Sequence, residues 1–223
     1  MRFAISNNVR VEAAPSVSGN CPACEGKMLA RCGTRRIWHW AHKGTNHCDQ
    51  WWEPETEWHR NWKAKFPESW TEVVQQAPSG ERHIADVKTA NGYVIEFQHS
   101  HISDAERLAR EQFYEQLIWV VDGLRLKQDQ NFLNAVRLGR IISGRSDRIV
   151  FNGNGFQVTK RWMLSQNLVC LDFGENDLWC VSPHRKNWQS FAAQISKTQL
   201  VDALQGGSLP PHALQLLHET QTY

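Results

Sequence analysis

The sequence has no long hydrophobic run, and that absence excludes a membrane-spanning helix. No stretch of about 18 consecutive apolar residues occurs in the chain. The first residues, MRFAISNNVRVEAAPS, also lack the apolar core of a secretory signal peptide. We therefore expect a cytoplasmic protein whose six cysteines ligate metal or remain free thiols rather than form disulfides.

The chain also lacks a strong excess of charge of one sign. Its net charge of +2 does not mark it as a nucleic-acid-binding protein by bulk electrostatics, so any basic surface must be local. At 223 residues and 41% hydrophobic, with no repeat or low-complexity tract, it has the composition of a globular protein with one large or two small domains.

Tryptophan, in contrast, is abundant. Seven of the eleven tryptophans fall between Trp38 and Trp70. Such rings either fill a small core, where they bury more area than other side chains, or stack on exposed nucleobases. We expect core packing to be their main role.

The clearest element pattern covers residues 53–125. Pro54, early acidic residues and the apolar spacing of Trp58, Trp62 and Phe66 predict a helix over 53–66. The later elements are strands at 70–76, 82–88 and 93–98, a helix at 103–116 and a strand at 117–121. This order, αβββαβ, predicts an α/β (α+β) fold with a mixed sheet and helices packed on it.

The flanking segments have weaker patterns. Residues 1–52 suggest short strands, two of them at 27–32 and 35–40. Residues 126–223 suggest a mixed α/β extension of unknown role, with strands near 147–151, 167–172 and 178–181 and helices near 128–139, 188–204 and 210–218. We therefore expect three parts, bounded at 1–52, 53–125 and 126–223.

Cysteine and histidine spacing predicts a structural zinc site in the first part. Cys21-x-x-Cys24 is followed by His39-x-x-His42 and then by Cys48. Five candidates thus compete for four tetrahedral positions, and we expect Cys21, Cys24 and His42 to be joined by either His39 or Cys48. The alternative is a redox pair or a chance spacing. No HExxH glutamate accompanies the ligands, which favours a structural over a catalytic zinc.

The remaining cysteines and the nearby basic residues have simpler interpretations. Cys32, Cys170 and Cys180 are expected to pack as small apolar side chains. Basic residues crowd the zinc module and form either a phosphate-binding patch or a solvated face: Arg31, Arg35, Arg36 and Lys43.

Acidic residues on two neighbouring predicted strands suggest a second metal site. Asp86 is flanked by apolar residues, and a buried acid needs a partner or a cation. Glu96 and Gln98 share one strand face. Carboxylates aimed at one spot suit Mg²⁺ or Mn²⁺. The alternative is a set of structural ion pairs with Arg82, Lys88 and Lys63.

The helix before these strands offers a polar stripe. Glu55, His59 and Lys63 are spaced i, i+4, i+8, with Glu53 and Glu57 as further acidic candidates. His83, His99 and His101 are expected to be hydrogen-bonded surface histidines rather than ligands.

Together these segments resemble the competence protein CoiA-like family. The resemblance covers roughly residues 20–123 and rests on the ordered strings CPAC (21–24), HWAH (39–42), ETEWHRNWK (55–63), HIADV (83–87), VIEFQHSHIS (94–103) and LIWVVDG (117–123). It implies a PD-(D/E)XK nuclease-like core and a role in processing incoming DNA during natural transformation.

The resemblance also implies roles for individual residues. Asp86 is the counterpart of the signature aspartate, Glu96 of the acid in the E-x-K element, and Gln98 stands at the lysine position. An amide orients water but carries no charge, so Lys63 or Lys88 is a candidate substitute. Asp86, Glu96 and Glu55 would hold the catalytic metal, while Gln98, with Lys63 or His59, would position the attacking water.

Two functions follow from these assignments. The first is a Mg²⁺- or Mn²⁺-dependent nuclease acting on single- or double-stranded DNA. The second is a DNA-binding module that retains the fold and the structural zinc with weak or no hydrolysis. A third interpretation is a scaffold that recruits DNA-processing proteins through residues 124–223.

Overall fold

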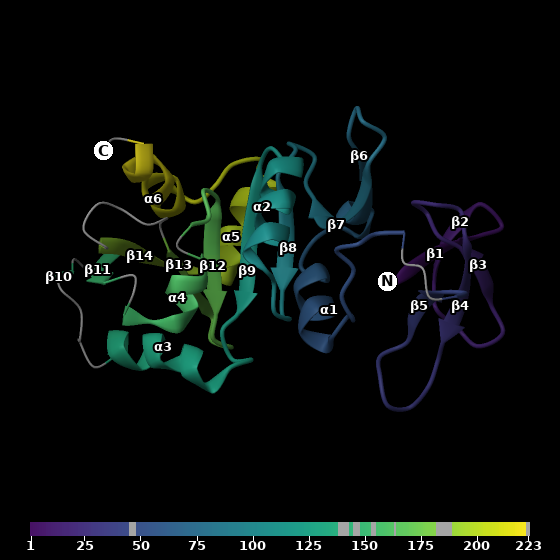
Figure 1. The fold of residues 1–223 in the computed structure, drawn as a ribbon, viewed down its shortest axis with the longest axis horizontal. Helices are drawn as coiled ribbons and strands as arrows, with labels where there is room; N and C mark the ends of the chain where they lie inside the picture. Colours follow the sequence, from purple (N-terminus) through teal and green to yellow (C-terminus); the bar gives the residue numbers. More distant parts are fainter. Residues whose placement is uncertain are drawn as a thin grey trace. The chain divides into compact units, whose positions relative to one another are not determined.

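The computed structural model describes residues 1–44, 48–137, 143–144, 148–152, 155–162, 164–181 and 189–221. The chain divides into two compact units, Met1–Lys88 and Thr89–Tyr223 (Figure 1). The predicted nuclease-like segment 53–125 includes residues of both units, and its status as one domain stays a prediction.

The first unit begins with a five-stranded antiparallel sheet. Its strands are β1 (Phe3–Ser6), β2 (Val9–Glu12), β3 (Ser18–Asn20), β4 (Lys27–Arg31) and β5 (His39–His42), in the order β2-β1-β3-β4-β5. Trp40 of the edge strand β5 is fully buried in the hydrophobic core of this unit, and its indole Nε1 donates to the Val11 carbonyl oxygen at 3.0 Å. Gly19 lies so close to this core that a Cβ there would stand 2.9 Å from the Ala4 Cβ.

The rest of the first unit is a helix and a hairpin. Helix α1 (Glu57–Lys63) is followed by a 3₁₀ turn, η1 (Glu68–Trp70), and by the antiparallel pair β6 (Thr71–Gln76) and β7 (Arg82–Lys88). The Thr56 side chain caps α1, so the helix begins later than the predicted residue 53, and Glu53 and Glu55 precede it. Trp62 is buried, as its spacing predicts.

The second unit contains a mixed sheet. Strands β8 (Val94–Gln98), β9 (Leu117–Asp122) and β12 (Leu168–Asp172) are mutually parallel neighbours. The sheet continues with antiparallel pairings through β13 (Asp177–Val181), β14 (Gln189–Ser196), β11 (Arg148–Asn152) and β10 (Ser143–Gly144). The expected mixed sheet is thus present.

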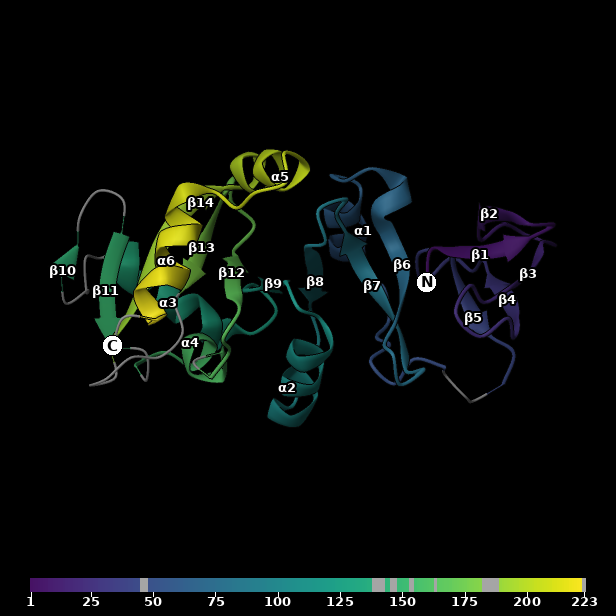
Figure 2. The ribbon, with the colours of Figure 1, turned by 90° about the horizontal axis from the view of Figure 1, so that it is seen from above.

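Helices cover both faces of this sheet. Figure 2 shows α2 (Asp104–Phe113) and α4 (Gln157–Trp162) on one side and α5 (Lys197–Gln205) on the other, and Figure 1 shows α3 (Gln130–Arg137) and α6 (Pro211–Gln221) on opposite sides of β11 and β14. A 3₁₀ turn, η2 (Lys127–Asp129), leads into α3. Phe132 of α3 is fully buried against Phe151 and Trp179. Among the described helices, none has the length and hydropathy needed to cross a bilayer.

Two expectations about the second unit are wrong. The predicted helix 188–204 is a strand, β14, followed by a shorter helix, α5, because β14 pairs with β11 and β13 along both edges. Cys170 and Cys180 are buried as expected, but they form a disulfide. The register of β12 and β13 places these two cysteines directly opposite each other, with a Cα–Cα distance of 4.0 Å.

Candidate functional site

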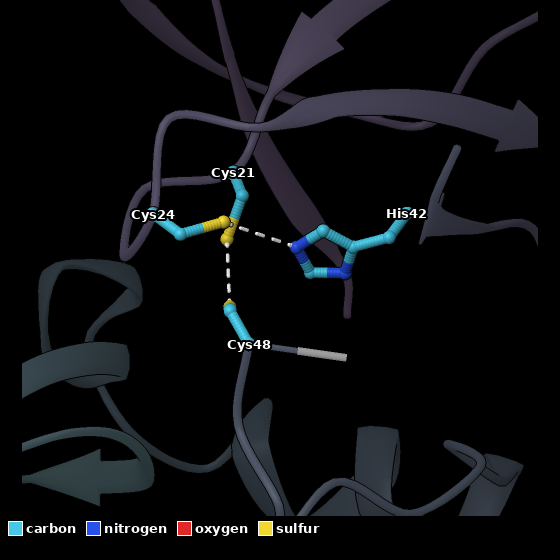
Figure 3. Close-up of side chains that lie close together, drawn as sticks. All are labelled: Cys21, Cys24, His42 and Cys48. Carbon is cyan, nitrogen blue, oxygen red and sulfur yellow. Dashed lines mark hydrogen bonds between the residues drawn. The ribbon is translucent and has the colours of Figure 1, made fainter. Parts of the chain in front are cut away.

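Three cysteines and one histidine of the first unit form a metal-ligand cluster. The ligand atoms of Cys21, Cys24, His42 and Cys48 all lie within 4.8 Å of one another (Figure 3). The Cys21 and Cys48 sulfurs are 3.6 Å apart, and the Cys24 sulfur is 3.4 Å from His42 Nε2. A tetrahedron with Zn–S bonds of about 2.3 Å and Zn–N bonds of about 2.0 Å separates its ligand atoms by about 3.5–3.8 Å. The set therefore fits zinc.

A tight turn between β3 and β4 presents the first two ligands. The Cys21 amide donates to the Gly26 carbonyl oxygen at 2.8 Å, and the Glu25 amide donates to the Cys21 carbonyl oxygen at 2.9 Å. Glu25 has a positive φ of 61°, which reverses the chain within a few residues. The Ala23 amide points at the Cys21 sulfur at 3.4 Å and stabilises a thiolate there.

Strand geometry explains why Cys48 rather than His39 joins the cluster. His39 and His42 both lie on β5, three positions apart, so their side chains leave opposite faces of the strand. The His39 Nδ1 instead bonds the Ile37 carbonyl oxygen at 2.8 Å. The spacing HxxH would place two ligands together on a helix, but not on a strand.

Two thiols of the cluster, Cys21 and Cys48, ionise less readily than free cysteines when no metal is bound. Burial raises the pKa of the Cys21 thiol, and burial together with the neighbouring Cys21 raises the pKa of the Cys48 thiol well above its usual value. A divalent cation would remove this cost by stabilising the thiolates. Cys32 lies outside the cluster and packs against the small core around Trp40, as expected.

A second cluster in the first unit surrounds one buried lysine. Lys63 Nζ lies 3.3 Å from Glu55, 3.2 Å from Glu72 and 2.9 Å from Asp86. Among these carboxylates, Asp86 is the most accessible, at 21% side-chain exposure against 3% for Glu55 and 4% for Glu72. The register of β6 and β7, with Thr71 opposite Val87, places Glu72 across from Asp86.

Electrostatics keep two members of this cluster, Lys63 and Glu72, charged. The nearby carboxylates outweigh the burial of Lys63 and raise the pKa of its ammonium group well above the usual value. Burial opposes the charge on Glu72, but Lys63 and two backbone amides overcome it and lower the pKa of Glu72 to about 2. Lys63 is therefore a fixed positive charge beside Asp86 rather than a proton acceptor.

Glu72 was not anticipated from the sequence. Its carboxylate accepts from the Arg2 amide at 2.7 Å and the Phe3 amide at 3.0 Å, so it anchors β1. Its φ of 48° is left-handed, a conformation rarely kept by a non-glycine residue without compensation. The sequence contained one clue to a buried acid here, because Glu72 precedes Val73 and Val74 in the strand predicted at 70–76.

His59, which the sequence places on the same polar helix stripe as Lys63, has a structural role. His59 is buried, with Nε2 2.8 Å from Glu53 and Nδ1 2.8 Å from the Thr56 hydroxyl. It completes the helix cap rather than facing Lys63. Glu55 also accepts from Arg60 at 3.2 Å, so both residues are held by neighbours in their own segment.

The remaining predicted acidic residue, Glu96, belongs to the second unit. Glu96 is buried on β8 and accepts from Arg110 Nη1 of α2 at 2.9 Å. Gln98 is also buried and donates through Nε2 to the Ser100 carbonyl oxygen at 3.1 Å. Arg110 is a partner that sequence reasoning missed, although its i, i+4 spacing from Glu106 hinted at a charged face.

The three further histidines differ in burial. His83 is buried rather than on the surface, with Nδ1 2.8 Å from Asp49 and Nε2 2.9 Å from Glu81. Burial lowers its pKa, but the two carboxylates outweigh this effect and the pKa is raised. His99 Nδ1 lies 2.8 Å from Asp122, and His101 is exposed. None of the three belongs to the metal-ligand cluster.

Comparison with known proteins bears on the first unit. No curated protein and no solved structure matches the chain. Residues 16–50, however, match the family model described as competence protein CoiA, N-terminal domain. All four residues of the metal-ligand cluster lie inside this segment. The match confirms the resemblance inferred from the sequence over this segment, which is similar to the N-terminal domain of competence protein CoiA.

Proposed function

We propose that this competence-related chain is a Mg²⁺- or Mn²⁺-dependent nuclease of the PD-(D/E)XK type that acts on DNA, with Asp86 and Glu96 as its metal-binding acids. The observation that carries the proposal is the position of Lys63, whose ammonium group lies 2.9 Å from Asp86. A lysine is expected near the signature aspartate, and Gln98 occupies the usual lysine position. In this proposal Lys63, beside Asp86, is the candidate for the role of that lysine.

Different residues of the chain would have different roles in metal-dependent hydrolysis of a phosphodiester. A divalent metal, when bound, polarises a phosphate oxygen and lowers the pKa of a water. Lys63 stays protonated because of its three carboxylates, so its role is to stabilise negative charge on the phosphate. The Gln98 amide orients the attacking water. Carboxylate oxygens from Asp86 and Glu96 suit a hard cation.

The zinc-type cluster and the basic residues around it support DNA as the substrate. The turn between β4 and β5 exposes Arg35 and Arg36, and Trp38 beyond them is 45% exposed. Arginines of this kind bind phosphates, and an exposed indole stacks on unpaired bases. A metal-stapled hairpin would hold these side chains in place for a DNA strand.

A DNA-binding module without hydrolysis is the second candidate. Glu96 is already neutralised by Arg110 in a buried environment, and Gln98 lacks the charge of the usual lysine. A carboxylate held in this way competes less well for a metal. In this interpretation the chain retains the zinc cluster and the basic hairpin but does not hydrolyse DNA.

Cleavage assays separate the two candidates. Single- and double-stranded DNA would be incubated with the full chain and Mg²⁺ or Mn²⁺. Asp86→Asn and Glu96→Gln should each lower the cleavage rate by at least a hundredfold, since each removes a charged metal ligand. Asp104→Ala is the matched control, because that acid is 78% exposed and pairs only at 3.8 Å with Arg107.

The possible outcomes are distinct. Metal-dependent cutting that survives both substitutions would refute the assigned site. DNA binding without cutting by the unaltered chain, on every substrate, would establish the binding module instead. Loss of cutting in Asp104→Ala to the same degree would point to an indirect effect on folding.

A further inference from the structure

A cavity of about 300 Å³ lies wholly within the second unit. It opens at the carboxyl ends of β8 and β9, and its lining includes Gln98 and Asp122 from these strand ends. Because β8 and β9 are parallel, their carboxyl ends meet at one edge of the sheet, where α/β proteins commonly bind ligands. Its volume is at the lower end of the range of about 300–1,000 Å³ for ligand pockets.

The inner wall of the cavity contains an acceptor that lacks a hydrogen bond. The Asp129 side chain is 3% exposed, and its Oδ2 is paired with Arg161 Nη2. Its other oxygen, Oδ1, is buried and has no hydrogen-bond partner within the described structure. Leaving such a group unsatisfied is costly, so Asp129 is suited to accept from an N–H or O–H donor placed in the cavity.

The outer wall is cationic and polar. Arg125 is exposed and lines the opening, together with the exposed His101. Gln128 and Gln157 add exposed amides that can both donate and accept. An arginine at the mouth of a pocket binds phosphate groups through charge-assisted hydrogen bonds.

An aromatic ring completes the lining. Trp162 is 4% exposed, packs on Trp119 with ring centroids 5.1 Å apart, and borders the cavity. Val121 and Leu126 supply further apolar surface. A ligand for this cavity must therefore combine a phosphate for the outer arginine, hydroxyl or N–H donors for the inner acid, and a flat apolar part.

We propose that this cavity binds one nucleotide unit, with its phosphate on Arg125 and its sugar or base donors on Asp129. A lone metal ion would leave the apolar lining unused, and a lone phosphate would leave Asp129 unsatisfied. The nucleotide is either free or the terminal unit of a DNA strand. The inference deepens the proposed nuclease function by adding a nucleotide subsite, and it rests on that function only for the DNA source.

Calorimetric titration of the full chain tests this subsite without any cleavage step. The probes are deoxyadenosine 5′-monophosphate, thymidine 5′-monophosphate, the nucleoside deoxyadenosine and inorganic phosphate, without added Mg²⁺ or Mn²⁺. We expect a nucleotide to bind at least tenfold more tightly than the nucleoside or phosphate. Arg125→Ala should weaken nucleotide binding at least tenfold, whereas the matched control Lys127→Ala, an exposed residue two positions away, should not.

Asp129→Asn probes the inner wall. It should weaken binding of the nucleoside and the nucleotide alike, because it removes the charge that accepts their donors. This variant also disturbs the Arg161 pair, so Gln157→Ala at the exposed rim provides a second lesion that leaves the fold intact. A several-fold loss in nucleotide affinity is expected for Gln157→Ala.

The source of the nucleotide is decided by competition. Displacement of the mononucleotide by a 5′-phosphorylated oligodeoxynucleotide assigns the cavity to a strand end, and failure to displace it assigns the cavity to a free nucleotide. The proposal is overturned if no nucleotide binds, if phosphate binds as tightly as the nucleotides, or if Arg125→Ala and Lys127→Ala behave alike. Nucleotide binding by a chain that cuts no DNA would overturn the nuclease proposal and leave this subsite standing.

Discussion

Replacing Lys63 with methionine removes one buried charge from the acidic cluster while keeping a side chain of similar length. Lys63 is 5% exposed and contacts three carboxylates. Removing one partner of a buried ion pair costs about 3–5 kcal/mol. Glu55 keeps Arg60, and Glu72 keeps two backbone amides, so we expect a loss near the lower limit, about 3 kcal/mol.

The loss should depend on pH in a direction set by the cluster. Glu72 has a lowered pKa of about 2 in the folded chain, so its contribution is present above its unfolded value of 4.5 and is lost as pH falls toward 2. Lys63 has a raised pKa, so its contribution is present below 10.5 and is lost as pH rises through the higher folded value. Without Lys63 the carboxylates take up protons more readily, and the deficit of the variant should shrink between pH 7 and pH 4.

Urea unfolding followed by tryptophan fluorescence measures this deficit, since seven of the eleven tryptophans lie in the first unit. Lys65→Met is the control, because Lys65 is exposed near the end of the same helix and carries the same charge. A loss below about 1 kcal/mol, no larger than that of Lys65→Met, would refute the assignment of a buried ion cluster. A deficit that stays constant from pH 7 to pH 4 would refute its electrostatic origin.

Three further predictions concern other parts of the chain. Metal analysis should find one zinc per chain, which Cys48→Ser loses and His39→Ala retains; equal retention in both variants would contradict the ligand set. Ser196→Ala removes the capping box of α5 and should lower the free energy of unfolding by about 1 kcal/mol in urea titrations, and an unchanged midpoint would argue against the cap. Replacing Arg35 and Arg36 together with alanine should weaken DNA binding and reduce its salt dependence in fluorescence anisotropy titrations; an unchanged salt slope would exclude this patch.

Local pattern was enough for much of this protein. Turn residues located β6, β7 and β8, an unbroken apolar run located β9, and the Ser103 cap located the start of α2, because these signals act over a few neighbouring residues. Cysteine spacing likewise located the metal-ligand cluster. It also left the fourth ligand open between His39 and Cys48.

Strand pairing in the tertiary structure decided two features that the local sequence pattern predicted wrongly. Residues 189–196 form a strand because β11 and β13 pair with them along both edges, although their composition suits a helix. Cys170 and Cys180 became a disulfide because two strands align in one register. The local sequence around a strand or a cysteine does not show which distant strand or cysteine it will pair with.

The Cys/His cluster separates what the local sequence determines from what only the tertiary structure determines. The sequence by itself determined which residue types gather in the first unit, since ligand chemistry and the Cys21–Cys24 turn are local properties. Only the tertiary structure decided that Cys48 joins the cluster and that Lys63 stands beside Asp86. The reason is geometric: a strand sends His39 and His42 to opposite faces, and the separate segments carrying Lys63 and Asp86 meet only after the chain has folded.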